Sequence, residues 1–135
     1  MARVEIRIPD LAPPVSHYTD AVRAGDFLFI SGMASLDKNG NVMAREDVVQ
    51  QTRNTMEAIG KVLKKVGATF ESVVKVTVYL KDINDRSRIN PVREEYFGDA
   101  RPASVLVEVS QLFVPGLLLE IDAVAYVPVP ATTQT

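Results

Sequence analysis

Two carboxylates interrupt an apolar segment near the C-terminus, and their type and spacing suggest chemistry. Glu120 and Asp122 stand inside the run LLLEIDAVAY, two residues apart, so in an extended strand both side chains point to the same face. A carboxylate in such a run is costly unless it meets water or a partner. The residues alone leave two interpretations open. One is a general base or water-orienting group in a cleft; the other is structural, with the strand at a sheet edge or both carboxylates paired with lysine or arginine at a subunit contact.

Two other segments offer groups for binding a ligand. The run FLFISG ends in Ser31 and Gly32, a hydroxyl and a residue without a side chain, which lets a ligand approach the main chain closely. The alternative is a strand that simply ends at a turn. Arg101 stands at the entrance to a later apolar run, and its planar guanidinium suits a substrate carboxylate. The alternative for Arg101 is a surface ion pair with Asp99.

Composition excludes several other kinds of chemistry. The 135 residues, 47% hydrophobic and 24% charged, are typical of one globular domain. The chain has no cysteine and one histidine, His17, so disulfides, thiolate zinc sites, cysteine nucleophiles and two-histidine metal sites are excluded. The net charge is -2, with a pI of about 5.4, so nucleic acid and anionic membranes are not expected as partners.

The elements that position these groups are short and lie between turn residues. Runs of β-branched and aromatic residues predict strands within 22–31, 73–80, 104–110 and 117–127, with a further one at 4–8. The first run predicts a tight hairpin around Ala24-Gly25-Asp26.

Apolar residues recur every three or four positions in two segments, which predicts helices over 46–66 and about 85–97. Glu46 and Asp47 are predicted in the first turn of the earlier helix, and Gly67 at its end. Asn90 and Pro91 are predicted near the first turn of the later helix, with Asn90 as its cap.

This order of elements, β-β-α-β-α-β-β, predicts an α+β sandwich in which a mixed sheet carries both helices on one face. The strands are apolar on nearly every position, so the second face also needs cover, and we expect a homo-oligomer. A single domain over residues 1–128 and a flexible tail over 129–135 are predicted. The N-terminal segment lacks the apolar run of a secretory signal, and the predicted location is the cytoplasm.

Taken together, these segments resemble the Rid (YjgF/YER057c/UK114) family from Pro9 to Val127. The resemblance is carried by YTDAVRAGDFLFISG, by VVKVTVYLKDINDRSRINPVREEYF, and by RPASVLVEVSQL followed by LLLEIDAVA. It implies a chorismate-mutase-like fold and homotrimers whose sheets form a central barrel, with three ligand clefts between neighbouring subunits. Such a trimer would cover the second face of the sheet.

The resemblance also implies an activity. Family members of the best-known type hydrolyse enamines and imines, such as 2-aminoacrylate, to a 2-keto acid and ammonia without a cofactor. By position, the resemblance implies that Tyr18, Ser31, Gly32, Asn90 and Glu120 line the cleft, with Glu120 and Tyr18 as catalytic residues and Glu120 orienting the attacking water. An imine carbon is already electrophilic, so modest general-base help and correct placement suffice.

One position departs from the family pattern. Active deaminases read Pro-Ala-Arg at a strand entrance, where the arginine grips the substrate carboxylate, but this chain reads Pro102-Ala103-Ser104. Ser104 and Leu106 share one face of an extended strand and would line the cleft without a charge. Arg101 would point to the opposite face and replaces the anchor only if the chain bends at Pro102. A neutral or larger substrate is therefore expected.

Three functions remain in competition. The first is a hydrolase of an enamine, imine or related small C–N compound, with a substrate preference altered by Ser104. The second is a non-catalytic trimer that binds a small metabolite in the same clefts. The third, the ribonuclease activity ascribed to some relatives, fits poorly with the acidic pI. No metal and no cofactor are expected.

Overall fold

A six-stranded sheet is the framework of the computed structural model, which describes residues 3–130. The strand order is β1-β2-β3-β6-β4-β5, and every neighbouring pair is antiparallel except β4 and β5, which are parallel. The strands are β1 (Val4–Ile6), β2 (Ala21–Ala24), β3 (Phe27–Met33), β4 (Val73–Leu80), β5 (Ala103–Glu108) and β6 (Leu119–Tyr126).

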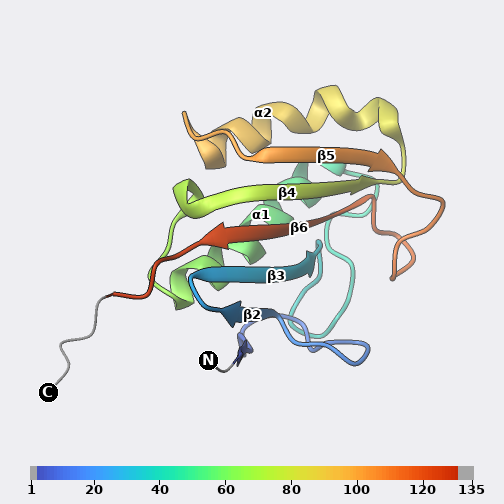
Figure 1. The fold of residues 1–135 in the computed structure, drawn as a ribbon. Helices are drawn as coiled ribbons and strands as arrows, with labels where there is room; N and C mark the ends of the chain where they lie inside the picture. The colour runs from blue at the N-terminus through green and yellow to red at the C-terminus, as the bar shows by residue number, and fades with distance from the viewer. Residues whose placement is uncertain (1–2, 131–135) are drawn as a thin grey trace, which may run out of the picture.

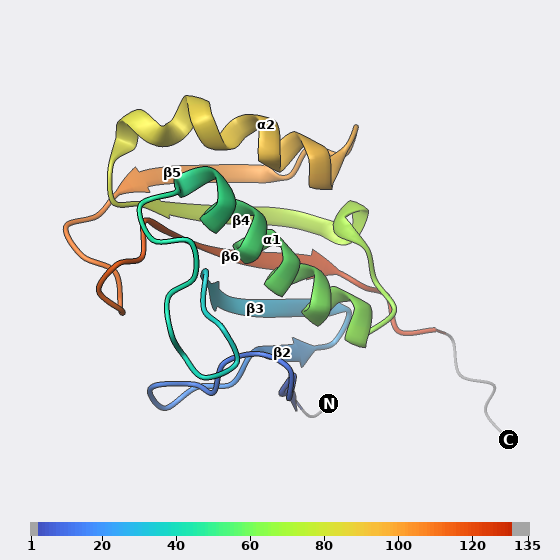
Figure 2. The same cartoon turned by 180° about the vertical axis from the view of Figure 1, so that it is seen from behind.

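The helices α1 (Val48–Lys65) and α2 (Arg86–Phe97) lie on one face of this sheet, as Figures 1 and 2 show from opposite sides. α2 is the crossover that joins the parallel strands β4 and β5. The predicted mixed sheet with two helices on one face is therefore confirmed, and the strand expected at 4–8 is present as β1.

The start and end of α1 follow from its flanking residues. The Asp47 side chain accepts a hydrogen bond of 3.0 Å from the Gln50 backbone N–H, so Asp47 is the N-cap. The prediction that Glu46 and Asp47 lie in the first turn was wrong. The first helical residue is Val48, and the N-cap Asp47 stands just before it. Gly67, with φ of 74°, follows the helix as predicted.

The prediction for Asn90 and Pro91 was also wrong. α2 begins at Arg86, directly after the 3-10 turn Ile83–Asp85, so Pro91 lies inside the helix and Asn90 caps nothing. Pro91 has no backbone N–H to donate to the Ser87 carbonyl. Ser87 and Pro91 are both exposed, so water can hydrate the Ser87 carbonyl and the helix continues.

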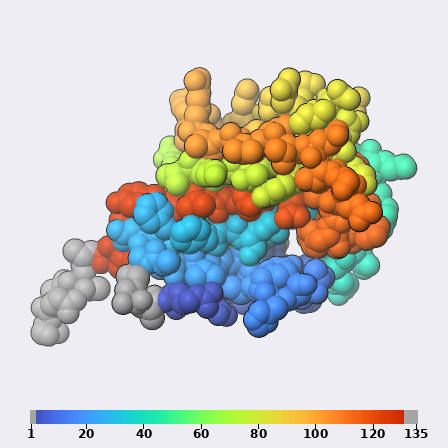
Figure 3. Space-filling view, turned by 45° about the vertical axis from the view of Figure 1, so that its right-hand side comes forward, coloured from blue at the N-terminus to red at the C-terminus, as the bar shows by residue number. Residues whose placement is uncertain are grey.

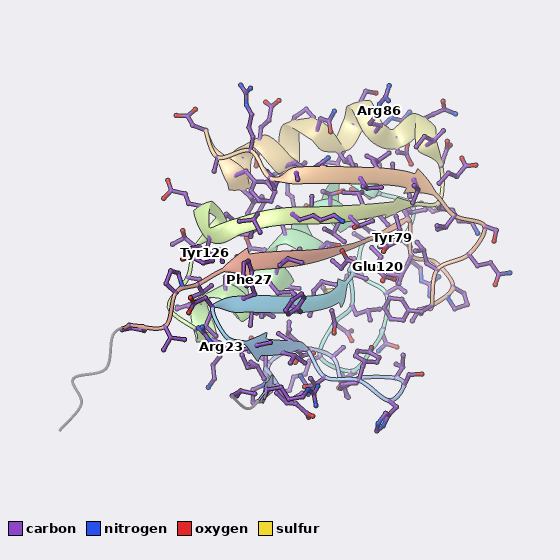
Figure 4. All side chains as sticks on the ribbon, in the orientation of Figure 1. Arg23, Phe27, Tyr79, Arg86, Glu120 and Tyr126 are labelled. Atoms are coloured by element: carbon purple, nitrogen blue, oxygen red, sulfur yellow. The ribbon has the colours of Figure 1, made fainter. Side chains whose placement is uncertain are left out.

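The two faces of the sheet differ sharply. Toward the helices, alternate strand residues such as Leu28, Val78 and Ile121 are buried in the core. The opposite face, turned toward the viewer in Figure 4, is open and largely apolar. Its exposed large side chains are Phe27, Phe29, Val105, Val107 and Tyr126, each between 38% and 49% exposed. Exposed apolar faces are typical of interaction surfaces, and the strand composition predicted that this face needs cover.

The chain remains attached to the sheet beyond β6. The Val129 backbone N–H donates to the Asp26 carboxylate at 2.9 Å. Of the tail predicted over 129–135, residues 131–135 lie outside the described part. Within residues 3–130, no helix is long and apolar enough to cross a membrane.

Candidate active site

Glu120 lies on the open face near the start of β6, beside Tyr79 of β4 (Figure 4). Its side chain is partly buried and borders a pocket of about 320 Å³. The pocket is lined by Val15, Ser16, Tyr18, Ser31, Gly32, Phe113 and Glu120. Four of the residues predicted for the site, Tyr18, Ser31, Gly32 and Glu120, are therefore brought together.

The end of β3 shapes the floor of this pocket. The pairing of β3 with β6 is irregular between Ile30 and Met33, which places Gly32 directly against Glu120. A Cβ atom at Gly32 would overlap the Glu120 carboxylate. The prediction was that a ligand approaches the main chain at Gly32, whereas the group that lies against Gly32 is the Glu120 side chain of the same protein.

Ser31 ties the end of β3 to the segment that carries Tyr18. Its backbone N–H donates to the Asp20 carbonyl at 2.9 Å, and its hydroxyl donates to the Thr19 carbonyl at 2.6 Å. Tyr18, which directly precedes Thr19 in this segment, is 43% exposed. These bonds fix the wall of the pocket that faces Glu120.

The two carboxylates of β6, Glu120 and Asp122, have different surroundings. Burial, followed by the nearby negative charge of Asp122, raises the pKa of Glu120. Asp122 accepts a hydrogen bond of 3.0 Å from the Tyr79 hydroxyl, and burial together with this bond raises the Tyr79 pKa. Within residues 3–130 neither carboxylate forms an ion pair. Of the two carboxylates, Glu120 is the one that lines the pocket.

An apolar wall of the pocket escaped the sequence analysis. Phe113, 41% exposed, stands in the loop before β6, and Val15, 59% exposed, stands in the segment before β2. Both segments lie at the same end of the sheet in Figures 1 and 3. An aromatic residue in a connecting loop was the available signal, but only the fold shows that this loop reaches the pocket of Glu120.

The remaining predicted residues lie elsewhere on the chain. Asn90 and Arg101 line a second pocket, of about 640 Å³, beside α2. Ser104 and Leu106 pair with Val76 and Val78 of β4, so they face the helix layer, opposite to Glu120. From the strand register, the Cα atoms of Ser104 and Glu120 are about 14 Å apart. Within one chain, Ser104 and Leu106 therefore lie apart from Glu120.

Among residues 3–130, no group of three or more histidine, cysteine or acidic side chains is arranged to hold a metal ion.

The family assignment follows from comparison with known proteins. The sequence profile of the endoribonuclease L-PSP family matches residues 10–127. RutC family protein PH0854 of Pyrococcus horikoshii is 43% identical over 123 residues, 90% of this chain and 97% of the relative. The chain belongs to this family, which confirms the resemblance to Rid proteins.

Two more distant relatives have names that state an activity. The 3-aminoacrylate deaminase RutC of Acinetobacter baylyi is 36% identical over 124 residues, covering 91% of this chain and 98% of the relative. The 2-iminobutanoate/2-iminopropanoate deaminase of Capra hircus is 36% identical over 121 residues, covering 90% and 87%. Homologues of this chain thus include deaminases of both enamines and imines.

Solved structures agree with the fold. The Rid family protein YyfA from Yersinia pestis superposes with a TM-score of 0.87 at 30% identity, covering 93% of this chain and all of that protein. TdcF from E. coli, solved with bound serine, superposes with a TM-score of 0.82 at 27% identity, covering 91% and 98%.

Proposed function

We propose that this chain is a Rid-family hydrolase that releases ammonia from an enamine, an imine or a related small C–N compound. The observation that carries the proposal is the partly buried Glu120 carboxylate, whose pKa is raised in a pocket shared with Tyr18, Ser31 and Gly32. The deaminases among its relatives support the reaction class.

In the proposed reaction, ionised Glu120 takes a proton from water while the water oxygen bonds to the imine carbon. The nitrogen gains one proton as the carbinolamine forms and a second, taken from the carbinolamine hydroxyl, as the carbonyl forms. The C–N bond breaks in this second step, and ammonia leaves with the electron pair of that bond. An enamine reaches the same route after taking a proton at carbon. Tyr18, a phenolic donor and acceptor on the same pocket, is the proposed partner in proton transfer.

We further propose that the complete site forms between subunits of a homotrimer. The apolar open face supports this assembly, as does the separation of Asn90, Arg101, Ser104 and Leu106 from Glu120 within one chain. A neighbouring copy of the chain can bring its own set of these four residues close to Glu120. Ser104, in place of the arginine expected there, then alters the substrate preference. Action on a small metabolite fits the cytoplasmic location predicted from the sequence.

The direct test generates imines in situ, with an amino-acid oxidase for 2-imino acids and an amine oxidase for neutral imines, and follows semicarbazone decay. The protein should lower semicarbazone formation and speed ammonia release. Ser104→Arg should change the ratio of kcat/KM between the two imine classes, and an unchanged ratio would contradict the altered preference. If no imine in the panel releases ammonia although ligands bind, the chain is a binding protein.

The trimer yields a prediction of its own. Val107→Glu places a carboxylate on the open apolar face, so we expect monomers and loss of ammonia release, because the two groups of site residues separate. Size-exclusion chromatography with light scattering measures the assembly. Ile83→Glu, at a residue 37% exposed on a 3-10 turn, is the matched control and should leave the trimer intact. A wild-type monomer would refute the assembly.

The raised pKa of Glu120 predicts the pH dependence. Ammonia release requires ionised Glu120, so kcat/KM should rise with pH through a midpoint above the ordinary glutamate value of 4.5. Asp122→Asn removes the neighbouring charge and should move that midpoint to lower pH, since the charge contributes to the raised pKa. The pH profile of kcat/KM measures both values. Equal midpoints in the two proteins would contradict this coupling.

A further inference from the structure

Arg93 is a cation on α2 that neither the sequence pattern nor the proposed mechanism uses. It follows Asn90 by three residues, so the two side chains lie on neighbouring positions of one helix face. Both line the pocket of about 640 Å³, together with Arg101. Arg93 thus joins Asn90 and Arg101 in a pocket that is separate from the pocket of Glu120.

Arg93 contacts Ser104, the residue at which this chain departs from the Pro-Ala-Arg pattern of the family. Its Nη2 donates a hydrogen bond of 3.0 Å to the Ser104 hydroxyl. Ser104 faces the helix layer because it pairs with Val76, a buried residue of β4. A guanidinium is therefore present beside residue 104, supplied by the helix rather than by the strand.

The surroundings of this guanidinium differ from those of the paired arginines. Arg7 and Arg53 bind the carboxylates of Asp20 and Glu95, but among residues 3–130 no carboxylate forms an ion pair with Arg93. Burial lowers the Arg93 pKa, yet a guanidinium remains charged at neutral pH. Guanidinium has five N–H donors, and the contact with Ser104 uses one, which leaves an edge for a bidentate anion.

We propose that Arg93 binds the substrate carboxylate and that Ser104 positions its guanidinium. This proposal rests on the proposed function, because it adds the anion site to the cleft that holds Glu120. The ligand class is a small acid whose carboxylate is adjacent to the reacting C–N group. Ser104 then changes the geometry of the anchor and does not remove it, in contrast to the neutral cleft expected from the sequence. Arg101 is exposed and has no such positioning contact among the described residues.

The test compares Arg93→Gln with wild type in two assays. Calorimetric titration with 2-oxobutanoate measures carboxylate binding, and we expect the variant to bind about 10- to 100-fold more weakly. In the imine assay, KM for 2-imino acids should rise with little change in kcat, and kinetics on neutral imines should be unchanged. Arg93→Lys keeps the charge and should recover part of the affinity.

The matched control is Arg88→Gln, which removes an exposed arginine from the same helix and should leave 2-oxobutanoate binding unchanged. Equal affinities of Arg93→Gln and wild type, loss of affinity in Arg101→Gln alone, or no binding by wild type would each overturn the proposal. If 2-oxobutanoate binding depends on Arg93 but no imine releases ammonia, the anion site stands and the hydrolase proposal fails. If 2-imino acids are hydrolysed with the same KM by Arg93→Gln and by wild type, the hydrolase proposal stands and the anion site at Arg93 fails.

Discussion

Replacing Glu120 with glutamine is expected to reduce ammonia release by about 10²- to 10⁴-fold, the usual contribution of a positioned general base. Glutamine keeps the size and the hydrogen-bonding reach of the side chain but cannot take a proton from water. The affinity for 2-oxobutanoate should therefore stay within a few-fold of wild type. Ammonia release and calorimetric titration, measured on the same preparations, separate the two effects.

The same substitution should raise the free energy of unfolding at neutral pH. The folded-state pKa of Glu120 lies above its unfolded value near 4.5, so the folded chain binds the proton more tightly than the unfolded chain. The resulting penalty is absent below the unfolded pKa and is fully present above the folded pKa. Urea unfolding should therefore show Glu120→Gln more stable than wild type at pH 7.5, with the difference shrinking as the pH falls through the folded-state pKa and vanishing below 4.5.

Glu108→Gln is the matched control for these experiments. Glu108 stands on β5 and accepts a hydrogen bond of 3.0 Å from the Ile83 backbone N–H, remote from the Glu120 pocket. It should retain the wild-type rate of ammonia release. A Glu120→Gln protein that also retained the wild-type rate would remove Glu120 from the mechanism and leave the binding interpretation in its place.

The sequence pattern was sufficient to predict the helices and strands and to suggest part of the candidate site. Alternating and three-to-four residue periodicities depend on local geometry, so the strands and both helices were predictable to within a few residues. Glu120 was a candidate because a carboxylate inside an apolar strand is costly, but the pattern alone left a structural role open, and the family resemblance implied the catalytic one. At Gly32 the pattern predicted only room above the main chain, and the contact with Glu120 became visible from the pairing of β3 with β6.

The rest of the site depends on long-range packing, which a residue pattern does not contain. Phe113 reaches the pocket because the loop before β6 and the segment before β2 meet at one end of the sheet. Arg93 reaches Ser104 because the parallel pairing of β5 with β4 turns residue 104 toward the helices. Even so, the spacing of Asn90 and Arg93 on a predicted helix placed both on one face, and this was the available signal.

Gly32→Ala is expected to lower ammonia release about 100-fold without unfolding the protein. The new methyl group would overlap the Glu120 carboxyl group, so this side chain must rotate away from the end of β3. Displacing a reacting group by about 1 Å typically costs about 10²-fold in rate. The carboxyl end of a glutamate is flexible, so the strand itself need not shift. Steady-state kinetics and urea unfolding measure the two effects.

The control for Gly32→Ala is Gly60→Ala in α1. A Cβ atom at Gly60 would stand 3.4 Å from the nearest ring atom of Phe70, close to ordinary contact, and alanine is the better helix former by about 1 kcal/mol. Gly60→Ala should therefore keep full activity and wild-type or greater stability. A similar loss of activity in both variants would show that the effect at Gly32 is not specific to the site.

A double-variant cycle decides whether Gly32 acts through Glu120. If the methyl group only displaces the carboxylate, adding Gly32→Ala to Glu120→Gln should cause little further loss, because no ionised base remains to misplace. If the two losses multiply instead, Gly32 contributes independently, for example through its backbone amide. The cycle also bears on the assembly, because a change that blocked trimer formation would reduce activity in either background. Light scattering on all four proteins separates that outcome from a local displacement of Glu120.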